Sequence, residues 1–455
     1  MKNLNNLVED DLRMIWHPAA QMKEYNEDFP PVPVVSGHGC YLQTADGREI
    51  IDIVSSWWCN LLGHCNADIT EALCAQAHTL EHVIFANMTH PWAVELAREL
   101  LKILPRGLTH FNFGDNGSSS VEMALKMAFQ YQYQTGNRRK IKFACLSEGY
   151  HGETIGALSV GSMDLYARMF RPMMMNNLHI EAPDCFRCPY GCDRCTCSVP
   201  CIEKARKAFA EHGEELCALI VEPLLQGAAG MRMYPASYLK ALRQLCDEYG
   251  VLLIADEIAT GFGRTGTMFA CQQAGITPDL MTLSKAITGG YMPMSVVCAT
   301  ENVYRAFYAD YKEGKAFVHS HTYAGNPLAC SCALAVLKVL RRDHILEKAS
   351  ENATWLNDRF VDEFGNFAEV GEIRHLGLIN AVELVADKNT KKPFESGLRI
   401  GYKLYKEALH NGLLLRNIGD IFYFNPPLNI EREDLDKALG IAVKSLKKIL
   451  WSQRV

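Results

Sequence analysis

The stretch Val251-Leu-Leu-Ile-Ala-Asp-Glu-Ile258 decides the fold, because an uninterrupted apolar run ends in two carboxylates. The run 251–255 predicts a strand buried on both faces, which is typical of a parallel sheet. Ligands of such sheets bind outside the carboxyl ends of the strands, where Asp256 falls. A carboxylate there can pair with a protonated ring nitrogen of a ligand. It can also cap a following helix without any ligand, and the stretch alone leaves both interpretations open.

The segments before this strand continue the pattern. Residues 219–221 predict a second buried strand, and residues 238–249 predict a helix with one apolar face. Gly250 follows at the position of a C-cap glycine. This strand–helix–strand order predicts an α/β fold with a mainly parallel sheet.

The C-terminal part has a different pattern. We expect two short strands, over residues 376–384 and 421–424. Two helices, over residues 398–410 and 432–450, are expected to pack around them. The sequence therefore predicts a large domain over residues 65–328 and a smaller α+β domain over residues 329–455. The N-terminal segment, residues 1–64, is expected to join the smaller domain through strands at residues 40–43 and 49–53.

Composition limits the classes of function. Hydrophobic residues make up 48%, charged residues 22%, and the formal net charge is -6, which is ordinary for a soluble globular protein. The absence of a basic block gives no support for nucleic acid or an anionic membrane as partner. The apolar runs are too short to span a bilayer, and the polar start lacks the layout of a signal peptide. We expect a cytoplasmic protein that acts on small molecules.

A Gly/Ser turn is the first candidate binding feature. Phe111-Asn-Phe-Gly-Asp-Asn-Gly-Ser-Ser-Ser120 predicts the end of a strand, and residues 121–130 predict a helix with an apolar stripe. Free backbone N–H groups at a helix N-terminus favour an anion, so Gly117 and Ser118 are candidates for a phosphate cup. Taken alone, the turn is explained more simply by a serine N-cap.

Lys285 is the second candidate. In Leu280-Met-Thr-Leu-Ser-Lys-Ala-Ile-Thr-Gly-Gly290 it follows another apolar run. A poorly hydrated lysine has a lowered pKa and is a competent nucleophile, although a surface lysine at a strand exit is the commoner case. The nearby Gly261-Phe-Gly-Arg-Thr-Gly266 matches the dinucleotide-binding pattern, but no βαβ unit opens there. We predict a loop beside the site instead.

The order of these segments carries more information than any one of them. The Gly/Ser turn, Gly149-Tyr-His-Gly152, Ala255-Asp-Glu257 and Lys285 follow one another in a series that resembles the class III aminotransferases of pyridoxal-phosphate fold type I. The resemblance covers essentially the whole chain. It implies that pyridoxal 5'-phosphate is held by Lys285 as a Schiff base, and that Lys285 is the catalytic base and acid.

The same resemblance implies the roles of individual residues. It implies these cofactor contacts: Gly117 and Ser118 at the phosphate, Tyr150 stacked on the pyridine ring, Asp256 at the ring nitrogen and Glu222 nearby. Thr322, in His319-Ser-His-Thr-Tyr-Ala-Gly-Asn-Pro327, resembles the threonine that reaches the phosphate of the neighbouring subunit. The resemblance therefore implies a homodimer with sites at its interface.

Further motifs resemble the biotin-pathway branch of this family, which converts 8-amino-7-oxononanoate to 7,8-diaminononanoate. The motifs are Trp16-His-Pro18, Ser55-Ser-Trp-Trp58, Gly227-Ala-Ala-Gly-Met-Arg-Met-Tyr234 and the segment 255–266. Trp57 and Trp58 would form flat walls for an aliphatic chain, and Arg416 would bind the substrate carboxylate. Tyr150 and Lys285 would also contact the substrate.

The amino donor implied by this resemblance is S-adenosylmethionine. However, Ala19 stands where members that use this donor usually carry an aromatic residue, and His321 and Tyr323 also depart from their pattern. Lysine is therefore the alternative donor. Another ω-aminotransferase activity, on 4-aminobutyrate, ornithine or a diamine, is a further alternative, against which the Trp57-Trp58 pair argues.

The chain has 17 cysteines, and six of them lie in Cys185-x2-Cys188-x3-Cys192-x2-Cys195-x-Cys197-x3-Cys201. The odd count and the absence of an export signal favour reduced thiols. Paired C-x-x-C spacing can hold zinc or an iron–sulfur cluster. Related class III enzymes carry Cys-Pro-Tyr/Phe-Gly inserts at this place with no metal implied, so we expect plain thiols and predict no metal ligand.

Overall fold

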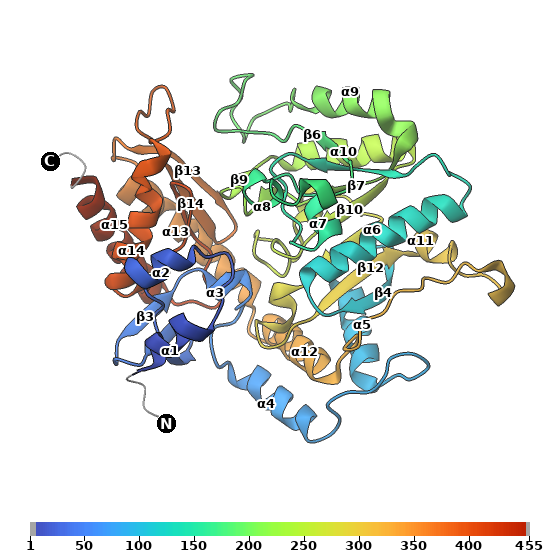
Figure 1. Cartoon of the computed structure of the whole chain (residues 1–455), viewed down its shortest axis with the longest axis horizontal. Helices are drawn as coiled ribbons and strands as arrows, with labels where there is room; N and C mark the ends of the chain where they lie inside the picture. Colours follow the sequence, from blue (N-terminus) through green and yellow to red (C-terminus); the bar gives the residue numbers. More distant parts are fainter. Residues whose placement is uncertain (1–5, 452–455) are drawn as a thin grey trace.

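A seven-stranded sheet forms the main body of the protein. Figure 1 shows the computed structural model, in which helices such as α6 (Gly117–Gln134) and α10 (Ala236–Tyr249) lie around this sheet. The structure describes residues 6–451. The strands, in their order across the sheet, are β4 (Leu108–Gly114), β12 (Ser295–Thr300), β11 (Leu280–Leu283), β10 (Leu252–Asp256), β7 (Leu216–Val221), β5 (Lys142–Leu146) and β6 (Leu178–Ile180).

Most neighbouring strands of this sheet run parallel. The pairs β10–β11, β10–β7, β5–β7 and β5–β6 are parallel, whereas β12 runs antiparallel to both β11 and β4. Every residue of β7, β10 and β11 is buried. Since helices cover both faces of such a sheet, its strands are apolar along their whole length rather than in alternation.

Helices pack against this sheet and against one another. Helix α6 packs on β11, β12 and β7, helix α10 packs on β10, and helix α12 packs on α4 and α5. The helices of this part are α4 (Ala67–Ala77), α5 (Pro91–Ile103), α6 (Gly117–Gln134), α7 (Ile155–Ser159), α8 (Asp164–Ala167), α9 (Ile202–His212), α10 (Ala236–Tyr249), α11 (Glu301–Arg305) and α12 (Pro327–Arg342).

Two smaller sheets make up the other side of the molecule. The C-terminal sheet has the order β13 (Val370–Leu376), β14 (Ile379–Leu384), β17 (Ile421–Phe424), β16 (Asn417–Ile418), and all of its pairs are antiparallel. The other sheet joins β1 (Val34–His38), β2 (Tyr41–Thr44) and β3 (Glu49–Asp52) to β15 (Leu413–Leu414). The remaining elements are α1 (Leu7–Met14), α2 (Met22–Glu27), α3 (Ser55–Trp58), α13 (Ile345–Phe364), α14 (Ile400–His410), α15 (Arg432–Trp451), β8 (Leu225–Gln226) and β9 (Arg232–Met233).

The N-terminal segment is tied to the C-terminal part of the chain by backbone hydrogen bonds. Strand β3 pairs with β15 in parallel, with Ile51 opposite Leu413. One continuous cluster of buried apolar side chains includes Ile51, Leu219 and Phe422, so it reaches the seven-stranded sheet and both four-stranded sheets. The predicted domain boundaries, after residue 64 and after residue 328, stay a prediction.

Several predicted elements are confirmed within a residue or two. The predicted helix 238–249 is α10, which ends at Gly250 with φ 60°. The predicted strand 421–424 is β17. The strand predicted over residues 376–384 is confirmed as β14, which begins three residues later than predicted, because the chain turns at Gly377, where φ is 56°, between β13 and β14. In the described part of the chain, no helix has the length and apolar character needed to cross a membrane.

Candidate active site

A cavity of about 400 Å³ lies at the carboxyl ends of the parallel strands. It gathers seven of the predicted site residues, although they are far apart in the sequence. They are Trp58, Gly117, Ser118, Tyr150, Glu222, Asp256 and Lys285. Strands β7, β10 and β11 end at this cavity with Glu222, Asp256 and the segment Ser284–Lys285. The topology of the sheet therefore brings the acids and the lysine together.

Lys285 lies in the cavity in a strained backbone conformation. It directly follows β11 and Ser284, and its φ is 45°, which is uncommon for a residue other than glycine. Its Nζ lies 5.5 Å from the centre of the Trp58 ring. Desolvation lowers the pKa of Lys285, while the negative charges of Asp256 and Glu222 act in the opposite direction. A neutral amine is thus more accessible here than on a surface lysine.

Asp256 ends strand β10 and is buried. Its Oδ2 lies 2.7 Å from Nδ1 of His151, and its Oδ1 accepts hydrogen bonds from the Ile258 amide at 3.1 Å and the Thr282 hydroxyl at 3.2 Å. Both carboxylate oxygens are therefore held in place by groups from three different segments. A carboxylate fixed in this way suits a cationic partner that requires a defined direction.

Glu222 is the second buried acid of the cavity. Its carboxylate accepts hydrogen bonds from the backbone amides of Tyr150 and Gly227, both at 3.0 Å. Burial raises the pKa of Glu222 to about 7, against the opposing effects of His151 and of the two amides. This acid therefore changes its protonation near neutral pH.

The Gly/Ser turn forms the N-terminus of helix α6, as predicted. Asn116 caps the helix through the Ser119 amide at 3.0 Å. Within residues 6–451, the amides of Gly117 and Ser118 have no acceptor, and both residues line the cavity. The simpler interpretation, a serine N-cap, is wrong, because the capping side chain is that of asparagine. Two free amides at the start of an 18-residue helix favour an anion.

Trp57 and Trp58, predicted to form flat walls for an aliphatic substrate, lie in the strained segment Ser55–Trp58. Ser55, Ser56 and Trp58 all have positive φ, between 51° and 67°. The buried Asp52 holds the turn, because it accepts hydrogen bonds from the amides of Val54 at 3.2 Å and Ser56 at 2.6 Å. Since such backbone strain persists only where the surroundings enforce it, the positions of the two tryptophans are tightly specified.

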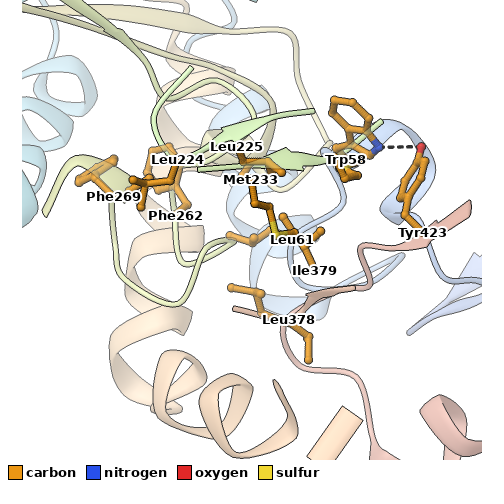
Figure 2. Close-up of a cluster of buried hydrophobic side chains, with 14 of the residues drawn as sticks. Trp58, Leu61, Leu224, Leu225, Met233, Phe262, Phe269, Leu378, Ile379 and Tyr423 are labelled. Carbon is orange, nitrogen blue, oxygen red and sulfur yellow. Dashed lines mark hydrogen bonds between the residues drawn. The ribbon is translucent and has the colours of Figure 1, made fainter. Parts of the chain in front are cut away.

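The two tryptophans of this segment differ in burial. Trp58 is buried in the same apolar cluster as Leu61, Leu224 and Leu225, and its indole N–H donates to the Tyr423 hydroxyl at 3.0 Å (Figure 2). Trp57 is 51% exposed and does not line the cavity. The two rings therefore face different surroundings, one in the core and one at the surface.

Arg416 directly precedes strand β16 and lies among aromatic rings. Its guanidinium carbon is 5.4 Å from the Trp57 ring centre and 5.6 Å from that of Tyr405. No carboxylate in the described part of the chain lies within ion-pair distance of Arg416, which is only partly buried. A guanidinium without a carboxylate partner can bind the carboxylate of a ligand by donating two hydrogen bonds to it. Arg416 does not line the cavity around Lys285.

Thr322 is exposed and also lies outside the cavity. Its neighbour His321 has Nδ1 2.9 Å from Oδ2 of Asp115, which lines the cavity beside the Gly/Ser turn. The segment 261–266 forms turns, as predicted, and its Arg264 is buried and donates to the backbone carbonyl of Pro426.

Sequence reasoning missed three contacts of the site. His151 contacts the Asp256 carboxylate, Asp52 accepts hydrogen bonds from the backbone of the tryptophan segment, and Tyr423 accepts a hydrogen bond from Trp58. His151 stands within the quoted Gly149-Tyr-His-Gly152, so the motif held a signal for it. Asp52 and Tyr423 are distant in sequence from the groups that they contact, and no local pattern marks them.

The cysteines form no metal centre in residues 6–451. No group of three or more His, Cys, Asp or Glu side chains is arranged there to hold a metal ion. All 17 cysteines fall in this range and are free.

Comparisons with known proteins agree with this geometry. The family described as "Aminotransferase class-III" matches residues 22–446. A relative from Geobacter sulfurreducens, named adenosylmethionine-8-amino-7-oxononanoate aminotransferase, is 42% identical over 96% of this chain and 97% of its own length. A crystal structure of the protein of the same name from Methanocaldococcus jannaschii has a TM-score of 0.92 and 34% identity, over 98% of this chain and 99% of that one.

A structure of an omega transaminase from Pseudomonas jessenii in complex with PMP has a TM-score of 0.92 and 29% identity, over 97% of this chain and 98% of that one. Since the family match covers nearly the whole chain and the relative from Geobacter is similar over its full length, this protein belongs to the class-III aminotransferases.

Proposed function

We propose that this enzyme transfers an amino group from S-adenosylmethionine to 8-amino-7-oxononanoate, giving 7,8-diaminononanoate for biotin synthesis. The observation that carries the reaction type is Lys285, an amine in a cavity with two buried acids and two free amides at a helix N-terminus. The substrates are supported by the names of relatives that are similar over nearly their whole length. The acceptor is supported by the tryptophan pair and the unpaired Arg416.

The residues of the cavity fit pyridoxal 5'-phosphate. The free amides of Gly117 and Ser118 would hold its phosphate, Tyr150 would lie on its ring, and Asp256 would pair with its ring nitrogen. The related omega transaminase was crystallised with PMP, which supports the same choice. When bound, pyridoxal phosphate supplies an electron sink for the charge that develops on the donor carbon.

The chain's own residues would supply proton transfer, orientation of the cofactor and binding of the substrate carboxylate. Lys285 acts at Nζ as nucleophile and moves a proton, because desolvation makes its neutral form accessible. Asp256 is held by His151 and Thr282, so its carboxylate would stay oriented toward the ring nitrogen of the cofactor during the reaction. Trp58 shields the lysine from water on one side, and Arg416 binds the carboxylate of the keto acid.

The second part of the proposal is a homodimer. Thr322 is exposed in this chain. The side chain of its neighbour His321 contacts Asp115, which lies beside the Gly/Ser turn. We propose that Thr322 contacts the cofactor phosphate of the partner subunit. The enzyme is expected to act in the cytoplasm.

The donor is tested by absorption spectroscopy of the enzyme loaded with pyridoxal phosphate. Addition of S-adenosylmethionine alone should remove the visible band of the lysine-bound cofactor and give the amino form. Addition of 8-amino-7-oxononanoate should then restore the band, with 7,8-diaminononanoate detected by mass spectrometry.

A response to lysine and not to S-adenosylmethionine would assign the enzyme to the alternative donor, which Ala19 favours, since it stands where users of S-adenosylmethionine carry an aromatic residue. A response to 4-aminobutyrate or ornithine with no turnover of 8-amino-7-oxononanoate would refute the biotin-pathway assignment.

A further inference from the structure

Trp57 and Trp58 are adjacent in the chain, yet their rings lie beside two different functional groups. The centre of the Trp57 ring is 5.4 Å from the guanidinium carbon of Arg416, and that of Trp58 is 5.5 Å from Nζ of Lys285. In the proposed function, Arg416 binds the carboxylate of the keto acid, and Lys285 serves the carbonyl toward its other end. The short segment that carries both rings therefore lies beside both ends of the acceptor site.

The Trp58 ring has little room to move. Its indole N–H donates to the Tyr423 hydroxyl at 3.0 Å (Figure 2). The ring also packs on Gly227, where an added β-carbon would lie 3.0 Å from it. The Gly227 amide in turn donates to the buried Glu222 of the cavity at 3.0 Å. A displacement of the Trp58 backbone would therefore move a wall of the cavity.

A buried carboxylate holds the backbone of this segment. Ser55, Ser56 and Trp58 have positive φ, a conformation that their surroundings must enforce. The carboxylate of the fully buried Asp52 accepts hydrogen bonds from the Val54 amide at 3.2 Å, and from the Ser56 amide and hydroxyl at 2.6 Å and 2.9 Å. The orientation of this carboxylate therefore determines whether the turn keeps its shape.

His64 supplies a further hydrogen bond to this carboxylate, from Nε2 to Oδ2 of Asp52 at 3.0 Å. The amide nitrogen of Asn60 lies 2.8 Å from Nδ1 of the same ring. Because an amide nitrogen only donates, Nδ1 accepts, and the proton of the neutral ring is at Nε2, facing Asp52. The backbone of His64 pairs with Gly39 in both directions, at 2.6 Å and 3.1 Å. The imidazole is therefore a donor in a fixed position.

We propose that His64 is a positioning residue that selects the chain length of the acceptor through Asp52. The imidazole orients the buried carboxylate, and the carboxylate holds the strained turn. The turn then fixes the two tryptophan rings beside Arg416 and Lys285. The substrates selected are keto acids with one length of aliphatic chain between carboxylate and ketone. This inference rests on the proposed function, because it takes these two groups as the ends of the acceptor site.

Two replacements of His64 separate its hydrogen bond from its volume. In His64→Gln the side-chain amide can still donate to Asp52 from a position close to that of Nε2. In His64→Leu the carboxylate loses this donor, although a side chain of similar volume remains. A third variant, Ser56→Gly, changes an exposed residue, removes its hydroxyl and relieves its positive φ of 58°. It loosens the same turn without placing an apolar side chain beside the buried carboxylate, so the test stands even where His64→Leu does not fold.

The test compares two acceptors in the full-length enzyme loaded with pyridoxal phosphate, at saturating amino donor. We expect kcat/KM for 8-amino-7-oxononanoate to exceed that for 7-amino-6-oxooctanoate, which is one methylene shorter, by about tenfold or more. In His64→Leu and Ser56→Gly this ratio should fall to about a third of its value or less, because a loosened wall accommodates both lengths. In His64→Gln the ratio should be retained.

The ratio separates positioning from a mere loss of folded enzyme, which would lower both kcat/KM values by the same factor. The matched control is His110→Leu, which removes a contact between an imidazole and the Glu301 carboxylate, at 2.6 Å, on the edge strand β4. It should leave the ratio unchanged. An unchanged ratio in both His64→Leu and Ser56→Gly would overturn the inference. An equal fall in His64→Gln or in His110→Leu would overturn it as well.

The result for the unchanged enzyme distinguishes this inference from the proposed function. Turnover of both acceptors with no preference between them would overturn the inference alone. No turnover of either acceptor, with S-adenosylmethionine or with lysine, would overturn the proposed function and this inference with it.

Discussion

At the residue scale, the unusual property of this site is a lysine that shares a cavity with two acids and yet has a lowered pKa. The acids would raise the pKa of an exposed lysine, so desolvation outweighs them here. The left-handed backbone of Lys285 adds strain that is maintained only because β11 and the following turns hold the residue.

The first prediction concerns this lysine. Lys285→Ala should reduce kcat by about a thousandfold or more, because a positioned acid–base group contributes about 10²–10⁴-fold. The variant should also lack the visible band of the lysine-bound cofactor. Steady-state turnover and absorption spectra check both. Lys338→Ala, at an exposed lysine on α12, is the control and should leave both unchanged. Full turnover of Lys285→Ala would contradict the proposed reaction.

The second prediction follows from Glu222, whose pKa burial raises from 4.5 to about 7. A carboxyl with a raised pKa binds its proton more tightly in the folded protein. Its contribution to stability is therefore complete below pH 4.5 and is lost as the pH rises to about 7. The loss amounts to about 3 kcal/mol at most.

Urea denaturation of the cofactor-free enzyme between pH 5 and pH 8 measures this effect. In Glu222→Gln the stability should fall less over this pH range than in the unchanged enzyme. Glu363→Gln, at a more exposed acid of α13, is the control. Equal pH dependence of Glu222→Gln and the unchanged protein would show that Glu222 does not titrate in this range.

The third prediction concerns Arg416, the unpaired guanidinium beside Trp57. Arg416→Lys should raise the KM for 8-amino-7-oxononanoate by about tenfold or more, because lysine cannot form the bidentate pair with a carboxylate. Steady-state kinetics at saturating donor measure this KM. Arg399→Lys, which alters an exposed pair with Glu24, should not change it. An unchanged KM in Arg416→Lys would show that another group binds the carboxylate.

At the scale of elements, the sequence predicted those segments whose structure is set by local pattern. Strand β10, helix α10 and the turn before α6 follow from an apolar run, a helical period and a Gly/Ser turn. The conformation of Ser55–Trp58 could not be predicted, because its positive φ angles are maintained by Asp52 and by a hydrogen bond from Ser55 to the carbonyl of Asn425. The contact of His151 with Asp256 likewise depends on the order of β5, β7 and β10 in the sheet.

The fourth prediction tests the contact between the C-terminal sheet and the loop after β8. The buried Arg374 of β13 donates to the Met231 carbonyl at 2.8 Å and to the Gly230 carbonyl, and it pairs with Glu383 at 2.9 Å. Arg374→Met leaves these buried acceptors without a partner. We expect a loss of about 3–5 kcal/mol of unfolding free energy.

Urea denaturation at neutral pH measures this loss. The matched control is Arg359→Met, because Arg359 pairs with Glu363 and Asp436 in a partly exposed position, where ion pairs contribute about 1 kcal/mol or less. Equal losses in the two variants would mean that the contact between the sheet and the loop adds little to stability.

At the scale of the whole molecule, the proposed dimer explains why a predicted cofactor residue lies outside the cavity of its own chain. Thr322 is exposed, and the neighbouring Val318 and Tyr323 are 88% and 62% exposed, so this segment presents apolar surface to its surroundings. If a second copy covers this segment, the apolar surface is buried and the threonine hydroxyl reaches the partner's phosphate.

The fifth prediction tests this arrangement. Thr322→Ala should weaken binding of pyridoxal phosphate by about tenfold, because a hydrogen bond to a charged group contributes about 1.5–3 kcal/mol. Titration of the cofactor-free enzyme, followed by its visible absorption, measures the affinity, and sedimentation should show a dimer in both proteins. Thr354→Ala, at an exposed position on α13, is the control. A monomeric enzyme that binds cofactor normally would contradict a shared site, because Thr322 does not line the cavity of its own chain.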